Sequence, residues 1–571
     1  MSTEKKLTGY PSIDKPWLKY HDAEAINALL PECTMYDYIW QNNKDYLNDI
    51  ALIYFNKKIT YGKMFEMIDK TAKAFLSIGV KAGDICTVLM LNQPEMVYVL
   101  YALNKIGAVC CVVNVLSSEK ELVHYLEEGN SKYFIALDVF FEKAYNAAKS
   151  CWINKLIYVP LWQSLGAIRN KIYRFKVKEP QATDSFVISW DSFMQKSNVN
   201  DFEAAAYEDG KCTVIGHTGG TTGTPKGVML TDKAFNSIAM QERTVFNFNR
   251  QDTFLDLIVP FAVYGLSNNL HVSLSFGLKV ILIPKVDPET TDELLYKYKP
   301  NHIASIPSYW TAVVKSKKLK DVSWLKTAAA GGSGMTIELE KELNEFLKVH
   351  NSKAHFMNGY GMSEVCGGVC LQTRDTAEIG SVGIPLCKVV ISAFDTDTLE
   401  EKKVNEEGEL CIKGPSMMLG YIANEAETAQ TIRAHEDGMW IHTGDVGYVN
   451  ENGIVFVKGR IKRMYITQHN GLVSKIFPDR IEKTVLKHPA IEDCCSVCIP
   501  KEDNTYIPIV YLVLKNQSDN QTSIINEVSE LCKADLPEYA QPVEYKFRES
   551  LPLTPIGKVD YRALEQEAAV L

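Results

Sequence analysis

One stretch decides the fold: His217-Thr218-Gly219-Gly220-Thr221-Thr222-Gly223-Thr224-Pro225-Lys226-Gly227. It follows the apolar run Cys212 to Ile215, so we expect a loop that leaves a buried strand. Glycines and small hydroxyl residues expose successive backbone N–H groups there, and Lys226 adds a positive charge. Such a loop suits a phosphate group, although the residues alone also allow a tight turn. A simple P-loop NTPase is disfavoured, because no Gly-Lys pair is followed by Ser or Thr.

Upstream of this loop, short apolar runs alternate with segments of helical pattern. A serine at 117 or 118 is placed to cap the second helix, and Gly129 to close it. The predicted order is strand, helix, strand, helix, strand: Ile85 to Leu91, Pro94 to Ile106, Ala108 to Val113, the segment up to Glu128, and Tyr133 to Leu137. This alternation predicts an α/β protein with mostly parallel sheets that helices cover on both faces.

Length and composition indicate a large globular protein of several units. The 571 residues correspond to about three to five domains at roughly 100 to 200 residues each. A net charge of −9, spread along the chain, gives no sign of a nucleic-acid-binding surface. The 14 cysteines are scattered and no cleavable apolar leader is evident, so reduced thiols and a cytoplasmic location are expected.

Two segments bear on membranes. The longest apolar run, Met96 to Leu116, is interrupted by Asn104, Lys105 and Gly107, which argues against a membrane span. Residues 161–178 combine apolar residues at helical spacing with five basic residues and no acidic one. This segment predicts either a weak peripheral contact with an anionic membrane or a solvated surface helix.

The loop resembles the Gly/Ser/Thr-rich loop of the adenylate-forming enzymes, which include acyl-CoA and aryl-CoA synthetases. Five further segments fit that family in the same order: Asn358-Gly359-Tyr360-Gly361-Met362-Ser363-Glu364, Gly408 to Tyr421, Thr443-Gly444-Asp445, Gly459-Arg460-Ile461-Lys462 and Pro555-Ile556-Gly557-Lys558. The resemblance extends from about Thr60 to Leu564. It implies that a carboxylic acid attacks ATP to give an acyl-adenylate and pyrophosphate, and that coenzyme A then accepts the acyl group.

The resemblance also implies roles for single residues. The phosphates of ATP would be held by Thr218, Gly219, Gly220, Thr221, Thr222 and Lys226. Mg²⁺ would be bound by Glu364 and Thr222, with Ser363 beside the α-phosphate. The adenine would be bordered by Gly332, Asn358, Gly359 and Tyr360, and the ribose hydroxyls would contact Asp445 and Arg460.

The family likeness further implies two parts that move relative to each other. Residues 1–459 would form the large N-terminal part with its subdomains, and 460–571 a small, mobile α+β lid. Lys558, in the lid, would be the catalytic lysine that bridges the carboxylate and the α-phosphate. Lys462 would be the hinge about which the lid turns to admit the thiol.

The segment Pro260-Phe261-Ala262-Val263-Tyr264-Gly265 departs from the family pattern, because it lacks a histidine that many members carry. It also lacks the aspartate with which peptide-synthetase domains bind an amino group, so an uncharged fatty, acyl or aryl acid is expected. The expected acyl pocket comprises Phe261, Val263, Tyr264, Ile306 and Gly331.

The hinge region departs from the family as well. Arg463 replaces an acidic residue that is common next to the hinge, and Gly471 is displaced from its usual position. The thiol acceptor is also open: free coenzyme A is favoured, and a separate carrier protein is the alternative, since no Leu-Gly-Gly-x-Ser motif appears in the sequence. A nucleotide-binding sensor without turnover is a more distant alternative.

Overall fold

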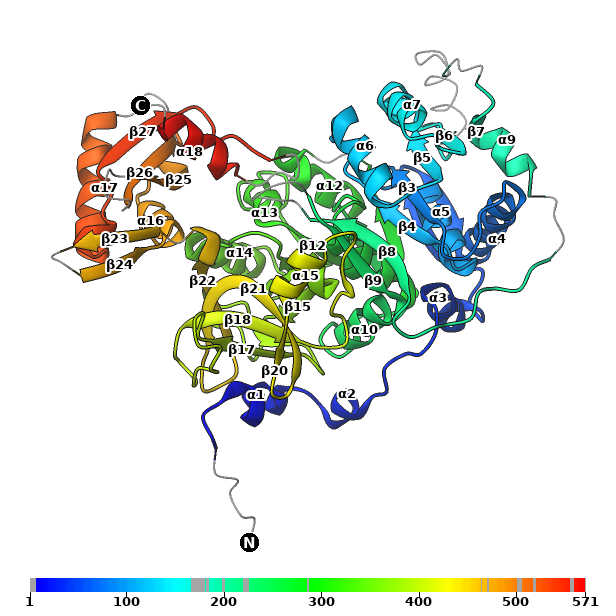
Figure 1. Ribbon diagram of the computed structural model, residues 1–571. Coiled ribbons are helices and arrows are strands. Elements are labelled where there is room, and N and C mark those ends of the chain that lie inside the picture. The colour runs from blue at the N-terminus through cyan, green and yellow to red at the C-terminus, as the bar shows by residue number, and fades with distance from the viewer. Residues whose placement is uncertain are drawn as a thin grey trace, which may run out of the picture.

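The structure is a computed structural model. It describes residues 7–569 except 166–179, 181–183, 198–200, 219–224, 285–286, 464, 470–471, 501–505, 517–519 and 555–558, and it leaves the side chains of 462 and 466–475 undescribed. Within this part of the chain, two large sheets and their helices form most of the N-terminal domain (Figure 1).

The first sheet contains the glycine-rich hairpin. Its order is β19 (Gly420–Tyr421), β9 (Gly227–Thr231), β8 (Cys212–His217), β4 (Val109–Val112), β3 (Ile85–Leu89), β5 (Tyr133–Leu137), β6 (Lys155–Val159) and β7 (Val187–Ser189). The strands from β8 to β7 are parallel, whereas β9 and β19 extend the sheet antiparallel. The predicted strand-and-helix order is confirmed, with α5 (Pro94–Lys105) and α6 (Glu119–Glu128) as the helices. Ser118 and Glu121 form a reciprocal capping box at the start of α6.

The second sheet contributes the edge at which most of the predicted site residues lie. Its order is β16 (Ile384–Pro385), β15 (Gly367–Leu371), β14 (Phe356–Met362), β13 (Thr327–Ala330), β12 (His302–Ser305), β10 (Thr253–Asp256), β11 (Lys279–Leu282), β1 (Ile50–Tyr54) and β2 (Lys57–Thr60). The six strands from β14 to β1 are parallel.

Two smaller groups follow along the chain. A five-stranded antiparallel sheet comprises β17 (Val390–Phe394), β18 (Gly408–Lys413), β20 (Ile432–His435), β21 (Gly438–Val449) and β22 (Val455–Arg460). The C-terminal domain, orange to red in Figure 1, combines three helices with five strands: β23 (Tyr465–His469), β24 (Leu472–Ile476), α16 (Pro478–Val485), β25 (Ile491–Pro500), β26 (Tyr506–Leu514), α17 (Gln521–Asp535), β27 (Glu544–Arg548) and α18 (Tyr561–Ala569). The predicted fold class is therefore confirmed.

Helices cover the faces of the large sheets. They include α3 (Met35–Asn43), α4 (Tyr61–Ser77), α7 (Phe141–Ser150), α9 (Trp190–Gln195), α10 (Asp232–Arg243), α12 (Thr291–Tyr298), α13 (Pro307–Val314), α14 (Ile337–Val349) and α15 (Glu425–Thr431). Helix α5 is buried along its whole length up to Asn104, which explains the apolar run that begins at Met96. No helix among the described residues is long and apolar enough to span a bilayer.

The N-terminal segment packs against the turn between β21 and β22. Trp17 is buried in an apolar cluster with Ile384, Ile454 and Phe456. Gly453, with φ of +84°, lies so close that an added Cβ would be 2.4 Å from the Trp17 backbone nitrogen. This turn therefore requires glycine both for its backbone conformation and for space.

We predict that Gly453→Ala lowers the free energy of unfolding by about 1 to 3 kcal/mol more than Gly83→Ala, because only Gly453 is crowded. Gly83 is the matched control: its φ is +83° and no atom lies within 4 Å of an added Cβ. Urea unfolding followed by tryptophan fluorescence measures both variants. Equal losses would contradict the packing argument.

Candidate nucleotide-binding site

The predicted phosphate loop connects β8 to β9, and its two ends are joined by hydrogen bonds. The Thr218 N–H donates to the Lys226 carbonyl oxygen at 3.0 Å, and the Lys226 N–H donates to Thr218 Oγ1 at 3.2 Å. The intervening residues 219–224 lie outside the described residues, so the roles expected of Gly219, Gly220, Thr221 and Thr222 stay predictions. The described ends establish a closed hairpin loop at this point of the sheet.

Lys226 links the loop to two later motifs. Its ammonium forms an ion pair with Glu427 on α15 and lies 4.9 Å from the centre of the Tyr421 ring. The Tyr421 hydroxyl donates to Glu364 Oε1 at 2.6 Å. A cavity of about 310 Å³ adjoins Lys226 and is also lined by His124, Glu128, Pro225, Ala423 and Asn424. An anion bound at the ammonium would compete with the Glu427 carboxylate.

Glu364 and Ser363 lie on the short helix η5 (Ser363–Val365) between β14 and β15. Glu364 is buried, and its backbone carbonyl accepts a hydrogen bond from the Met418 N–H at 2.8 Å. Burial and the neighbouring Glu364 carboxylate raise the pKa of Tyr421 well above its ordinary value, so the phenol remains a donor. The arrangement holds one carboxylate oxygen of Glu364 in a fixed position.

Asp445 forms a second polar centre with two predicted partners. Its Oδ1 pairs with Arg460 Nε at 2.8 Å, and its Oδ2 accepts from the Tyr360 hydroxyl at 2.5 Å. Asp445 and Arg460 are direct neighbours across β21 and β22, whereas Tyr360 comes from β14 in the second sheet. The Asp445 carboxylate is nearly inaccessible, while the Arg460 side chain is 48% exposed. Arg460 is therefore the more accessible partner of this ion pair.

Three predicted residues lie at the carboxyl edge of the second sheet, where open α/β sheets commonly bind ligands. Ile306 follows β12, and Gly331 and Gly332 follow β13. A Cβ on Gly331 would lie 3.1 Å from the Gly359 carbonyl oxygen, and one on Gly332 would lie 3.7 Å from Ile306 Cγ2. Glycines thus let these chain segments approach each other closely.

Asn358 forms hydrogen bonds with other residues of the protein through its side chain and its backbone. Its Nδ2 donates to the Ser381 carbonyl oxygen, and its backbone N–H donates to Gln372 Oε1, both at 2.9 Å. The contact predicted between its side chain and an adenine is not tested by this geometry. The amide has a clear structural role, since it joins β14 to the 381 turn.

The residues expected to form the acyl pocket divide among different apolar clusters. Phe261 packs with Ile215 in one cluster, whereas Val263 belongs to the main core. An added Cβ on Gly216 would lie 2.4 Å from Val263 Cγ2, so a glycine in β8 accommodates this valine. Tyr264 packs against the cluster at β12 and β13.

Two buried carboxyl groups near Tyr264 were missed by the sequence analysis. Glu242 on α10 accepts a hydrogen bond from Asn268 Nδ2 at 2.6 Å, and Asp256 at the end of β10 accepts one from Asn269 Nδ2 at 3.2 Å. Burial raises the pKa of Glu242 to about 8 and that of Asp256 to about 7. Both carboxyls lie near enough to contribute to the raised pKa of Tyr264. The adjacent amides Asn268 and Asn269 were the available signal.

The hinge region is described only in part. Lys558 and the Lys462 side chain lie outside the described residues, so their predicted roles are not tested. Arg463, the unusual residue beside the hinge, pairs with Asp479 Oδ1 and Glu482 Oε1, each at 2.6 Å. The Arg460 N–H donates to Asp479 Oδ2 at 3.2 Å, which ties the last residue of β22 to the C-terminal domain.

Comparison with known families agrees with this geometry. The AMP-binding enzyme family matches residues 39–422, and the AMP-binding enzyme C-terminal domain matches residues 480–558. The chain therefore belongs to the AMP-binding enzyme family, as the ordered motifs indicated.

Individual relatives are named as ligases. A long-chain-fatty-acid–CoA ligase of Bacillus subtilis is 27% identical over 97% of this chain and 98% of its own length. A probable 4-coumarate–CoA ligase of Dictyostelium discoideum is 27% identical over 89% of this chain and 91% of its own length. The solved benzoate CoA ligase of Burkholderia xenovorans has a TM-score of 0.78 at 20% identity, covering 93% of this chain and 99% of that one.

The buried Glu242 makes a testable contribution to stability. Its pKa of about 8 means that the folded protein keeps a proton that the unfolded chain releases near the ordinary value of 4.5. Stability should therefore fall as the pH rises between about 5 and about 8, and Glu242→Gln should reduce that slope by up to about 1.4 kcal/mol per pH unit.

Urea unfolding at a series of pH values measures this slope. The exposed Glu342→Gln variant removes the same kind of charge from the surface and should keep the wild-type profile. A Glu242→Gln profile parallel to that of the wild type would contradict a protonated Glu242.

Proposed function

We propose that this chain is an AMP-forming acid–thiol ligase. It activates a carboxylic acid with ATP to give an acyl-adenylate and pyrophosphate, then transfers the acyl group to coenzyme A and releases AMP. The observation that supports this most strongly is the Tyr360–Asp445–Arg460 group beside the Glu364–Tyr421–Lys226 series, in a chain that matches both domains of the family.

The described contacts support separate roles for these residues in binding the ribose, the phosphates and the base of ATP. Asp445 would accept hydrogen bonds from the ribose hydroxyls once the exposed Arg460 side chain moves toward the nucleotide and uncovers the carboxylate, which Tyr360 continues to hold. Lys226 would contact the phosphates once they displace Glu427 from its ammonium. Gly332 and Gly359 would border the base with their backbones.

Glu364 fits a magnesium ligand by donor chemistry, because Mg²⁺ prefers oxygen ligands and this carboxylate is buried and oriented by Tyr421. Thr222 would be the second ligand. The ion would offset negative charge on the phosphate oxygens. Ser363, next to Glu364, would lie beside the α-phosphate.

We further propose that the chain divides at 459/460 and that residues 460–571 close over the site. Lys558 would then stabilise charge on the α-phosphate during adenylation, and rotation about Lys462 would admit the thiol. Arg463 supports a fixed conformation of the segment after the hinge, because its guanidinium binds Asp479 and Glu482 of α16 within the proposed lid.

The acid is expected to be an uncharged fatty or aryl acid, consistent with the fatty-acid and 4-coumarate ligases among the relatives. Phe261, Val263, Tyr264, Ile306 and Gly331 stay the residues that we propose to line its pocket. The reaction would take place in the cytoplasm. Contact of 161–178 with a membrane stays a prediction, since 166–178 lie outside the described residues.

Tyr360→Phe should weaken ATP binding about fivefold, which corresponds to a loss of about 1 kcal/mol for one hydrogen bond to Asp445. The ring, which supports β14, would remain. Isothermal titration with ATP measures the affinity. Tyr296→Phe, at an exposed tyrosine, is the matched control, and an unchanged affinity in Tyr360→Phe would contradict the proposed role.

Pyrophosphate release from MgATP, measured over aliphatic, aromatic and amino acids with and without coenzyme A, tests the whole proposal. We expect release with an uncharged acid and formation of its CoA thioester. Release without a thioester would favour a carrier protein as acceptor, and no release with any acid would favour the sensor alternative.

Lys558→Ala provides a control for the two half-reactions. It should abolish pyrophosphate release but largely spare thioester formation from a supplied acyl-adenylate. Equal loss of both steps would exclude the role assigned to this lysine.

A further inference from the structure

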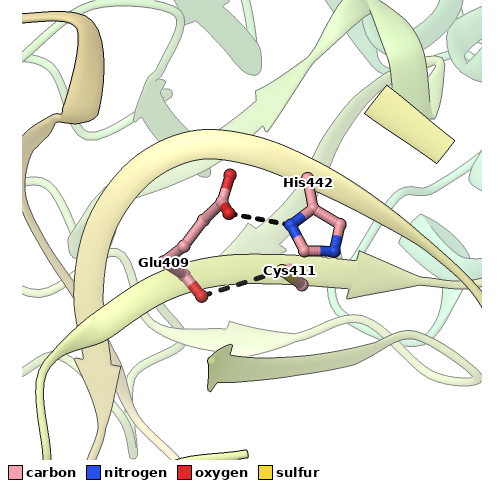
Figure 2. Close-up of side chains that lie close together, drawn as sticks. All are labelled: Glu409, Cys411 and His442. Atoms are coloured by element: carbon pink, nitrogen blue, oxygen red, sulfur yellow. Dashed lines mark hydrogen bonds and ion pairs between the residues drawn. The ribbon is translucent and has the colours of Figure 1, made fainter. Parts of the chain in front are cut away.

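A buried group of metal-binding side chains lies on the antiparallel sheet, and the proposed reaction does not use it. Figure 2 shows Glu409 and Cys411 on β18 facing His442 on β21. Ligand atoms of these three residues lie within 4.8 Å of one another. Cys411 and His442 are direct neighbours across the two strands, so their side chains share one face of the sheet.

A second histidine contacts this group from outside. His435, at the end of β20, places its Nε2 3.0 Å from His442 Nε2. On its other side, His442 Nδ1 lies 2.7 Å from Glu409 Oε2. Both ring nitrogens of His442 are therefore held, and metal-binding histidines commonly have such a partner at the nitrogen that does not bind the ion.

The surroundings suit a small, partly closed site. Cys411 and His442 are buried, whereas His435 is partly exposed and would provide access from solvent. The rings of Phe394 and Trp440 pack around His435 at 4.5 and 6.1 Å between ring centres. Among charged neighbours, Arg433 acts on Glu409 and His435, and its Nε donates to the Gln430 carbonyl oxygen.

We propose that the Glu409 carboxylate, the Cys411 thiolate and His442 Nδ1 form a zinc site, with His435 as the partner that orients His442 at its Nε2. An imidazole nitrogen together with a thiolate favours Zn²⁺ over Mg²⁺ or Ca²⁺, and three protein ligands leave one position open in a tetrahedral site. On binding, the Cys411 S–H releases its proton to solvent, the His442 proton moves from Nδ1 to Nε2, and the His435 proton moves from Nε2 to Nδ1. The charges of the thiolate and of Glu409 offset that of the ion.

This site is distinct from the magnesium site proposed at Glu364, because it offers nitrogen and sulfur donors. It nevertheless adjoins the nucleotide region, since Glu409 Oε1 accepts the Gly444 N–H at 2.9 Å, one residue before Asp445. A bound zinc ion would join β18 to β21 beside the segment that carries Asp445. Without metal, the same residues form only a hydrogen-bonded chain from His435 to Glu409.

Cobalt titration of the metal-stripped full chain, without nucleotide, distinguishes a metal site from a group of side chains that only form hydrogen bonds. We expect one Co²⁺ per chain, a thiolate-to-cobalt charge-transfer band, and loss of that band when Zn²⁺ is added. Cys411→Ser should abolish the band. His435→Asn should weaken zinc binding by about 10- to 100-fold, because it removes the outer partner of His442.

The control is His350→Asn, which changes a partly buried histidine on another element and should retain both the band and the affinity. Circular dichroism checks the fold of each variant. His435 is partly exposed, so His435→Asn keeps the test decisive if the buried Cys411 variant does not fold. Absence of the band in the wild-type protein, or unchanged zinc affinity in His435→Asn, would overturn the proposal and leave the hydrogen-bonded chain as the role.

Discussion

The Asp445 carboxylate holds together parts of the molecule that are far apart in sequence. It binds Arg460 from the neighbouring strand and Tyr360 from the second large sheet, so one buried charge joins two sheets. Arg460 then contacts Asp479 through its backbone, and Asp479 binds Arg463 in the C-terminal domain. A single anion thus connects the parallel sheet, the antiparallel sheet and the domain we propose to move. Burying that charge is tolerable only because both of its oxygens are engaged.

Much of this arrangement could be predicted from the sequence. The alternation from Ile85 to Leu137 predicted the central strands and helices, because local periodicity and capping residues agree with the final packing there. Asp445 and Arg460, both expected at the ribose, form a direct ion pair at 2.8 Å, and their contacts with the nucleotide stay predictions. The prediction that these residues share one site came from the ordered motifs that resemble the family, and not from composition.

The contacts that escaped prediction are those between residues without any regular spacing. Glu427 binds Lys226 across 201 positions, and no periodic pattern marks such a pair. Glu242 was hidden because a lone acid on a helix normally indicates an exposed face, yet this one is buried against Asn268. That Phe261 and Val263 belong to different apolar clusters could not be predicted either, since the two residues are almost adjacent in sequence. Tertiary packing alone decides such cases.

The two-residue strand β19 matters for how the protein is made. It pairs with β9, and the flanking Leu419 and Ile422 N–H groups donate to the Met229 and Gly227 carbonyl oxygens. During synthesis the outer edge of the glycine-rich hairpin therefore remains without this partner until the ribosome has added almost 200 further residues. An uncovered strand edge is a site for wrong pairing. The emerging chain thus depends on a late segment to protect an early one, which makes translation rate and chaperone contact relevant to its yield.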